Sequence, residues 1–171
     1  KQLLYTLTVS HDGSVPVYFT SHSGNVVDDT THIATWDLLC QLVGGPDFLY
    51  VADCKLASAE NLGHIARHGG RFVTVMPRSH GEDEQFRAKV RQSSDAVRWE
   101  TLYDVTDEEG NVTDRLFVCA EEGLSSEGYR LLWYRSTRKA ELDQATRARH
   151  VQRALAALTE LRERCLSPRT R

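Results

Sequence analysis

The sequence predicts an α/β fold in which a mixed sheet is flanked by helices. Residues 31–76 alternate in the order helix, strand, helix, strand, which is typical of parallel strands joined by a helical crossover. A hairpin-like pair of segments precedes this unit at residues 2–20. Residues 137–165 have the apolar spacing of one long helix. An antiparallel hairpin beside parallel strands predicts a sheet of mixed strand direction.

The first element is the hairpin. Residues 2–9 alternate between apolar and polar types and are rich in β-formers, and residues 15–20 read as the returning strand. The His-Asp-Gly-Ser stretch at 11–14 has the composition of a hairpin turn. Pro16 is expected at the start or at the edge of its strand, since proline has no backbone N–H to donate.

The alternating unit follows. Residues 28–31 offer several N-caps for a helix over residues 31–43, which Gly44 and its neighbours should end. Residues 48–52 form a continuous apolar run of strand length, as expected for a central strand buried on both faces. That run ends abruptly in Asp53.

The second helix of this unit should begin at an N-cap, Ser58, and continue to about His68. A second apolar strand is predicted at residues 71–76, where Pro77 stops it. The two strands should lie parallel, with the helix as their crossover connection.

The second half of the chain is more polar. We predict a short helix at residues 82–91, a hairpin of residues 101–105 and 115–119, a further strand at 129–134, and a long helix at 137–165. The long helix at 137–165 has apolar residues close to helical spacing along most of its length.

The amino-acid composition indicates the broad class to which the protein belongs. The chain has 171 residues, of which 40% are hydrophobic and 26% charged, as in ordinary globular domains. No apolar run reaches the ~20 residues that a membrane span needs. The four cysteines lie far apart without a CxxC pair, which argues against a zinc site and favours reduced thiols in the cytosol.

Charge is distributed unevenly along the chain. Residues 130–171 hold eleven Lys or Arg and four Asp or Glu, a balance of about +7, whereas residues 1–129 hold ten basic and twenty acidic residues, a balance of about −10. This asymmetry favours an anionic partner at the C-terminal end. The alternative is a solvated helix face without a partner.

Asp53 is the strongest candidate for a site residue. A carboxylate at the C-terminal end of a strand in an α/β unit lies at the edge where such folds bind ligands. Carboxylate oxygens are the ligands that Mg²⁺ prefers. The alternative is a loop aspartate that caps the next helix or is solvated.

His64 and His68 form an i, i+4 pair, but no carboxylate stands beside them in the sequence as in H-E-x-x-H zinc sites, and we interpret them as surface residues.

The residues around Asp53 carry a resemblance to a known family. The run Phe-Leu-Tyr-Val-Ala-Asp-Cys-Lys-Leu at 48–56, followed by Glu-Asn-Leu at 60–62, resembles the "VADS-x-L…EN" segment of DDE transposases from bacterial insertion sequences. Three further stretches resemble the same family in the same order: residues 1–7, residues 13–28 with their "dG-x-P-v…GN-x-xD" pattern, and residues 70–74. Residues 78–171 match by organisation alone.

The resemblance implies an RNase H-like catalytic core. It also implies that two Asp and one Glu hold two Mg²⁺ ions, with Mn²⁺ as an alternative, for cleavage and transfer of DNA strands. Asp53 would be the second aspartate, both a catalytic residue and a metal ligand. The first would lie on a preceding strand, before this chain begins. Glu141 does not stand in the family's glutamate pattern, so we expect the glutamate beyond Arg171 and treat this chain as an internal fragment that is inactive alone.

The resemblance also implies a division of the chain. Residues 1–77 would be a partial core, residues 78–136 a β-rich insertion, and residues 137–171 a basic long helix and tail. DNA, as transposon ends, would be the partner in the bacterial cytoplasm, in association with the nucleoid. We assign DNA contacts to three arginines of the long helix: Arg147, Arg149 and Arg153.

Two other functions stay open at this point. The chain could be a non-catalytic remnant that binds DNA or forms a homodimer through its basic helix. It could also be a related metal nuclease of the same fold, which would have to supply the other carboxylates from its own residues.

Overall fold

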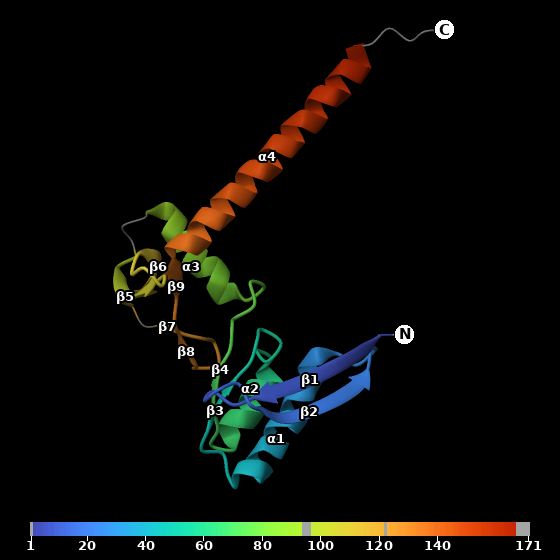
Figure 1. Ribbon diagram of the computed structural model, residues 1–171, viewed down its shortest axis with the longest axis vertical. Coiled ribbons are helices and arrows are strands. Elements are labelled where there is room, and N and C mark those ends of the chain that lie inside the picture. The colour runs from blue at the N-terminus through green and yellow to red at the C-terminus, as the bar shows by residue number, and fades with distance from the viewer. Residues whose placement is uncertain (1, 94–96, 122, 167–171) are drawn as a thin grey trace. The chain divides into compact units, whose positions relative to one another are not determined.

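The structure is a computed structural model that describes residues 2–93, 97–121 and 123–166. It forms two compact units, unit 1 at residues 1–87 and unit 2 at residues 88–171. The predicted α/β class is confirmed at this coarse level, with small sheets, short helices and a long C-terminal helix (Figure 1).

Unit 1 contains the hairpin and the alternating helix–strand segments. Its elements up to residue 73 are β1 (Leu3–Val9), β2 (Pro16–Ser23), a 3-10 turn η1 (Asp28–Thr31), α1 (His32–Val43), β3 (Leu49–Val51), α2 (Ala59–Arg67) and β4 (Arg71–Val73). Every predicted element of this region is present. The residues expected to cap α1 instead form η1, and β4 ends three residues earlier than predicted.

The hairpin pairs as its alternating pattern predicts. Leu3 of β1 lies opposite Ser23 of β2, and the register continues to Thr8 before it shifts. Burial alternates along β1, so that one face of this strand is half-buried and the other is exposed. The exposed face is apolar and includes the stacked rings of Tyr5 and Phe19, whose centroids lie 5.7 Å apart.

The parallel strands β3 and β4 are connected by α2, whose two ends are set by nearby residues. The Ser58 side chain accepts a hydrogen bond of 3.2 Å from the Asn61 N–H and so begins α2. At the end of α2 the chain turns through Gly69, whose φ of 76° favours glycine. It then returns as β4, which pairs with β3 in parallel, with Tyr50 opposite Phe72.

The predicted single mixed sheet is not formed by the described residues. The hairpin β1–β2 and the parallel pair β3–β4 are separate two-stranded sheets, and a groove of about 1060 Å³ lies between β1 and β3. The expectation of a central strand buried on both faces was also wrong for β3. Tyr50 is buried, but Leu49 and Val51 are 53% and 65% exposed because no described element covers that face.

The core of unit 1 is small and is centred between α1, α2 and β3. Leu56 and Ile65 are fully buried, and they form a cluster with three other buried residues: Trp36, Leu39 and Tyr50. Gly70 passes so close to this cluster that an added Cβ would lie 2.6 Å from both Ile65 and Trp36. The sequence places glycine at this point because a larger residue would displace core side chains.

Unit 2 begins within the helix α3 (Gly81–Gln92). Its remaining elements are β5 (Trp99–Thr106), β6 (Val112–Cys119), β7 (Gly123–Leu124), β8 (Arg130–Leu131), β9 (Tyr134–Ser136) and α4 (Thr137–Leu166). The predicted hairpin is confirmed as β5–β6. The single strand predicted at 129–134 is instead split: β8 pairs with β7, whereas β9 pairs with β6.

The long helix α4 begins at the sheet of unit 2 and extends beyond it (Figure 1). None of its residues is buried, so the predicted apolar spacing forms an exposed stripe that includes Val151, Leu155 and Leu158. Among the described residues, no helix combines the length and apolar composition that a membrane crossing requires.

Candidate functional site

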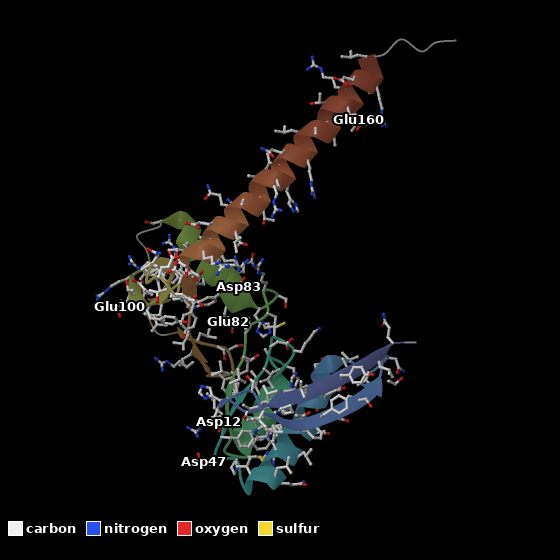
Figure 2. All side chains as sticks on the ribbon, viewed as in Figure 1. Asp12, Asp47, Glu82, Asp83, Glu100 and Glu160 are labelled. Carbon is white, nitrogen blue, oxygen red and sulfur yellow. The ribbon has the colours of Figure 1, made fainter. Side chains whose placement is uncertain are left out.

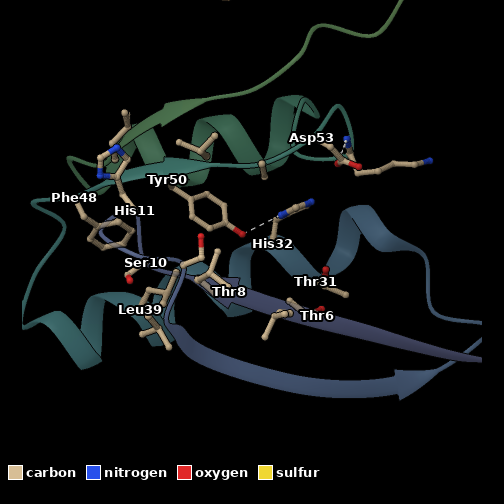
Figure 3. A pocket seen from close by; sticks show the side chains of 18 of the residues that line it. Thr6, Thr8, Ser10, His11, Thr31, His32, Leu39, Phe48, Tyr50 and Asp53 are labelled. Carbon is tan, nitrogen blue, oxygen red and sulfur yellow. Dashed lines mark hydrogen bonds between the residues drawn. The ribbon is translucent and has the colours of Figure 1, made fainter. Parts of the chain in front are cut away.

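Asp53 lies two residues beyond the last residue of β3, at its C-terminal end, as the sequence predicts (Figure 3). Its carboxylate is exposed, and its Oδ1 accepts a hydrogen bond of 2.9 Å from the Lys55 N–H. The Thr74 hydroxyl donates to the Asp53 carbonyl oxygen and so ties this turn to the end of β4. The carboxylate is therefore held at the carboxyl edge of the two parallel strands, where ligands bind in α/β units.

Asp53 also lies at one end of the groove between β1 and β3. Tyr50 and His32 lie in the same groove, and the Tyr50 hydroxyl is 3.1 Å from His32 Nδ1 (Figure 3). Burial raises the pKa of Tyr50 to about 12, so its hydroxyl stays protonated at neutral pH. Tyr50 therefore acts as a neutral polar group in this groove.

The residues present do not make up a metal site by themselves. Within the ranges that the structure describes, no three His, Cys, Asp or Glu side chains gather as a metal site would require. Asp53 offers one carboxylate, whereas an Mg²⁺ site of the expected kind uses more protein oxygens. The predicted role of Asp53 as a metal ligand thus depends on carboxylates from outside the described residues.

The three arginines assigned to DNA do not share one face of α4. At about 100° per residue, Arg149 and Arg153 lie four residues apart and face the same side of the helix. Arg147 lies on the side of the apolar stripe, near Val151. All of these side chains are exposed, as is Glu141, which does not stand in the family's glutamate pattern. Figure 2 shows side chains projecting from α4 along its length. Arg149 and Arg153 are the pair placed to contact one surface.

Sequence reasoning missed the carboxylate that anchors α4. Asp114 of β6 accepts hydrogen bonds from the hydroxyls of Ser136 and Thr137, at 2.7 and 2.9 Å, and from the Arg138 N–H at 3.0 Å. It therefore caps the first turn of a helix that begins more than twenty residues later in the chain. The Arg138 N–H, followed by the Ser136 hydroxyl, holds the pKa of Asp114 below its ordinary value.

Asp114→Asn is expected to destabilise unit 2 at neutral pH, because the charged cap is lost. A carboxyl whose pKa is lowered by folding stabilises the fold above its unfolded pKa and stops doing so as pH falls through its folded pKa. The difference between wild type and variant should therefore be full above about pH 5 and shrink below pH 3.8, the ordinary value. Urea unfolding followed by circular dichroism across that range measures it. A difference that grows with acidification would contradict this expectation. Asp143→Asn, nearly two turns into α4, is a control with a smaller expected effect.

A contact between a histidine and an aspartate was also missed. His64 Nε2 of α2 lies 2.7 Å from Asp37 Oδ1 of α1, and the rings of His64 and His68 are 4.4 Å apart. The carboxylate that the sequence did not place beside this histidine pair thus comes from the neighbouring helix. The set does not form a metal-binding group within the described part of the chain. It joins α1 to α2 beside Trp36, whose ring meets His64 edge-on.

Comparisons with known proteins add no relative: no family model, curated protein or solved structure matches the chain.

Proposed function

We propose that this chain is a segment of a DDE-type transposase core, and that Asp53 is one of three carboxylates of its active site. The supporting observation is the position of Asp53 two residues beyond the end of β3, in a motif that resembles the segment around the second aspartate of that family. DNA transposition by metal-dependent strand cleavage and transfer is the activity that the resemblance implies. Mg²⁺ is the metal it implies, with Mn²⁺ as the alternative.

The local fold around Asp53 supports this proposal. A parallel β3–β4 pair with α2 as its crossover is the local unit expected after the hairpin of an RNase H-like core. The single mixed sheet of such a core remains part of the proposal, since the described strands form two separate pairs here. The other two carboxylates belong, on this proposal, to polypeptide outside residues 1–171.

The purified chain tests the proposal of an incomplete site. With linear DNA and either Mg²⁺ or Mn²⁺, we expect residues 1–171 to leave the DNA intact, because one carboxylate cannot hold the two ions of this chemistry. The measurement is strand cleavage and strand joining on a denaturing gel. Metal-dependent cleavage that Asp53→Ala abolishes would contradict the incomplete site and favour the alternative of a self-sufficient nuclease.

The exposed helix α4 favours a second candidate function, a non-catalytic module that binds DNA or forms a homodimer. Seven Lys or Arg and four Asp or Glu lie on α4, and Arg149 and Arg153 face the same side. The apolar stripe with Val151 and Leu155 has no covering element among the described residues, and a second copy of the helix could cover it. DNA and a second copy would thus use different faces of α4.

Neutralising the shared arginine face tests DNA binding. We expect Arg149→Gln with Arg153→Gln to weaken duplex binding and to reduce the slope of log affinity against log salt by about 2, because each phosphate contact contributes about 0.9 to that slope. Fluorescence anisotropy at several salt concentrations measures both. Arg147→Gln, on the stripe side, is the single-residue control. It should leave the slope nearly unchanged, whereas each arginine of the binding face should reduce it by about 1. An unchanged slope in the double variant would remove α4 as the DNA-binding element.

A further inference from the structure

The apolar stripe of α4 has the residue spacing of a coiled coil. Between residues 148 and 165, six positions follow one another at steps of three, four, three, four and three residues. At about 100° per residue they lie within an arc of about 100°, so they face one side of the helix. We call these six positions the seam, and they are Ala148, Val151, Leu155, Leu158, Arg162 and Cys165.

The described residues leave the seam uncovered. None of the residues of α4 is buried, and Val151, Leu155 and Leu158 are each more than half exposed. Figure 1 shows α4 extending beyond the sheet at which it begins. Since a helix in a protein is stabilised mainly by packing of its apolar face, a partner that covers the seam would stabilise α4.

The seam is complementary to itself when two copies of α4 run in opposite directions. In that arrangement Leu155 of each helix lies opposite Leu158 of the second copy. Beside the seam, the small Ala154 lies near the larger Leu161 of the second copy, so that small and large side chains fit together across the contact. The same residues contribute from both helices, as in the interface of a two-fold symmetric dimer.

Arg162 is the charged residue of the seam, and it decides the direction of pairing. In a parallel pair it would face Arg162 of the second copy, and two like charges would lose water at the same place. In the antiparallel pair it lies level with Val151 of the second copy instead. The two Arg162 residues are then eleven positions apart along the axis (162 against 151), or about 16 Å, which is about twice the Debye length at physiological salt.

The charges along α4 favour the same direction. Residues 147–153 hold three arginines and no acidic residue, whereas residues 160–164 hold two glutamates and two arginines. Parallel pairing would place the basic segment beside its own copy, while antiparallel pairing places it beside the balanced segment, and the helix dipoles also prefer opposite directions. Arg149 and Arg153 lie on the side of α4 opposite Val151, so pairing leaves them exposed.

We propose that α4 pairs with α4 of a second copy of this chain as an antiparallel two-stranded coiled coil, centred between Leu155 and Leu158. The pairing places the two sheets from which the helices extend at opposite ends of the helix pair. This inference deepens the second candidate function and rests on its homodimer alternative. It involves neither Asp53 nor DNA cleavage.

The first test measures the oligomeric state of the whole chain by sedimentation equilibrium under reducing conditions. We expect a dimer, and we expect Leu158→Asp to raise its dissociation constant roughly a hundredfold or more, because both copies would bring a carboxylate into the apolar seam. Leu142→Asp is the matched control. Leu142 is an exposed leucine of α4 about 180° round the helix from Val151, and its substitution should leave the dissociation constant unchanged. Circular dichroism checks that each variant keeps its helix.

The second test measures the direction of pairing by disulfide formation in a Cys54→Ser background, which removes the other exposed thiol. Ala148 lies opposite Cys165 of the second copy in the antiparallel pair, whereas the two Cys165 residues are 17 positions apart (165 against 148), or about 25 Å. A disulfide needs Cα atoms within about 7 Å. With oxidised glutathione, we therefore expect Ala148→Cys to give a covalent dimer on a non-reducing gel, and the chain with Cys165 alone to stay uncrosslinked. Thr146→Cys, on the other side of α4, is the matched control and should also stay uncrosslinked.

Three results would overturn the proposal. A chain that stays monomeric at about 100 µM would remove the homodimer alternative and leave the seam to a segment outside residues 1–171. Crosslinking through Cys165 alone would show a parallel dimer, so the homodimer alternative would stand while the antiparallel pairing would fall. A dimer that Leu158→Asp leaves intact would use another surface. The proposed role of Asp53 is untouched by each of these results.

Discussion

Trp36→Ala is expected to lower the free energy of unfolding of unit 1 by about 3–5 kcal/mol, the usual cost of removing a buried tryptophan. Trp36 is 2% exposed and belongs to the small cluster that holds α1 against α2 and β3. Its ring lies 6.3 Å from Phe48 and 5.7 Å from His64. Few other buried residues exist in unit 1 to compensate, so the cavity should affect every element that contacts the cluster.

Native-state amide hydrogen exchange of α1 and α2 measures this loss without assuming that both units unfold together. A loss below about 1 kcal/mol, the average for all point substitutions, would contradict the central place of Trp36 in the core. Leu155→Ala is the matched control. Leu155 is an exposed apolar residue of α4, and its removal should change stability by no more than about 0.5 kcal/mol.

Trp36→Phe separates the packing of the ring from its polar group. Trp36 Nε1 is buried, and no acceptor among the described residues bonds to it. An unsatisfied buried donor costs about 1–3 kcal/mol, and phenylalanine removes it while keeping most of the apolar contact. We therefore expect Trp36→Phe to cost clearly less than Trp36→Ala. Equal losses for the two variants would contradict this expectation, because they would mean that an aromatic ring at this position stabilises the core no more than a methyl group does.

The elements that could be predicted from the sequence are those set by local chemistry. Ser58 begins α2 because its hydroxyl accepts from an N–H three residues later. Gly44 ends α1 because it adopts a φ of 85°, which glycine tolerates best. Asp53 follows an apolar strand, so its position at the strand end was also predictable.

The features that were missed depend on contacts between distant residues. Asp114 caps α4 through residues 22–24 positions later, and Asp37 meets His64 across 27 positions. The spacing of residues along the sequence does not predict such contacts, because they depend on how helices and strands pack against one another. The separation of β1 from β3 was missed for the same reason, because it too depends on packing between distant segments. The apolar run at β3 predicts a strand but does not say which neighbours cover its faces, and Leu49 and Val51 are consequently exposed.

The split of the predicted strand at 129–134 has a related cause. Its residues read as one continuous β segment, yet β8 pairs with β7 and β9 pairs with β6. Strand propensity is present throughout, but the choice of partner belongs to tertiary structure. The same holds for the candidate site. The position of Asp53 at the end of β3 could be predicted from the sequence, whereas the residues that would complete a metal site with it could not.

The proposed role of Asp53 in DNA transposition is tested most directly by excision from a donor plasmid, in cells that express the natural gene with all its coding sequence. We expect Asp53→Asn to reduce excision roughly a hundredfold or more, since changing even residues that merely orient a metal ligand costs about 10–100-fold. Because Asp53 is exposed, the substitution should leave the fold intact.

Asp47→Asn is the matched control, because it removes the same charge before β3 instead of after it. Asp47 is exposed and pairs with Arg71 at 2.8 Å, an ion pair of a kind that contributes little to stability. We expect near wild-type excision for Asp47→Asn and background excision for Asp53→Asn. Equal excision by the two variants, at wild-type level, would contradict the proposed role of Asp53.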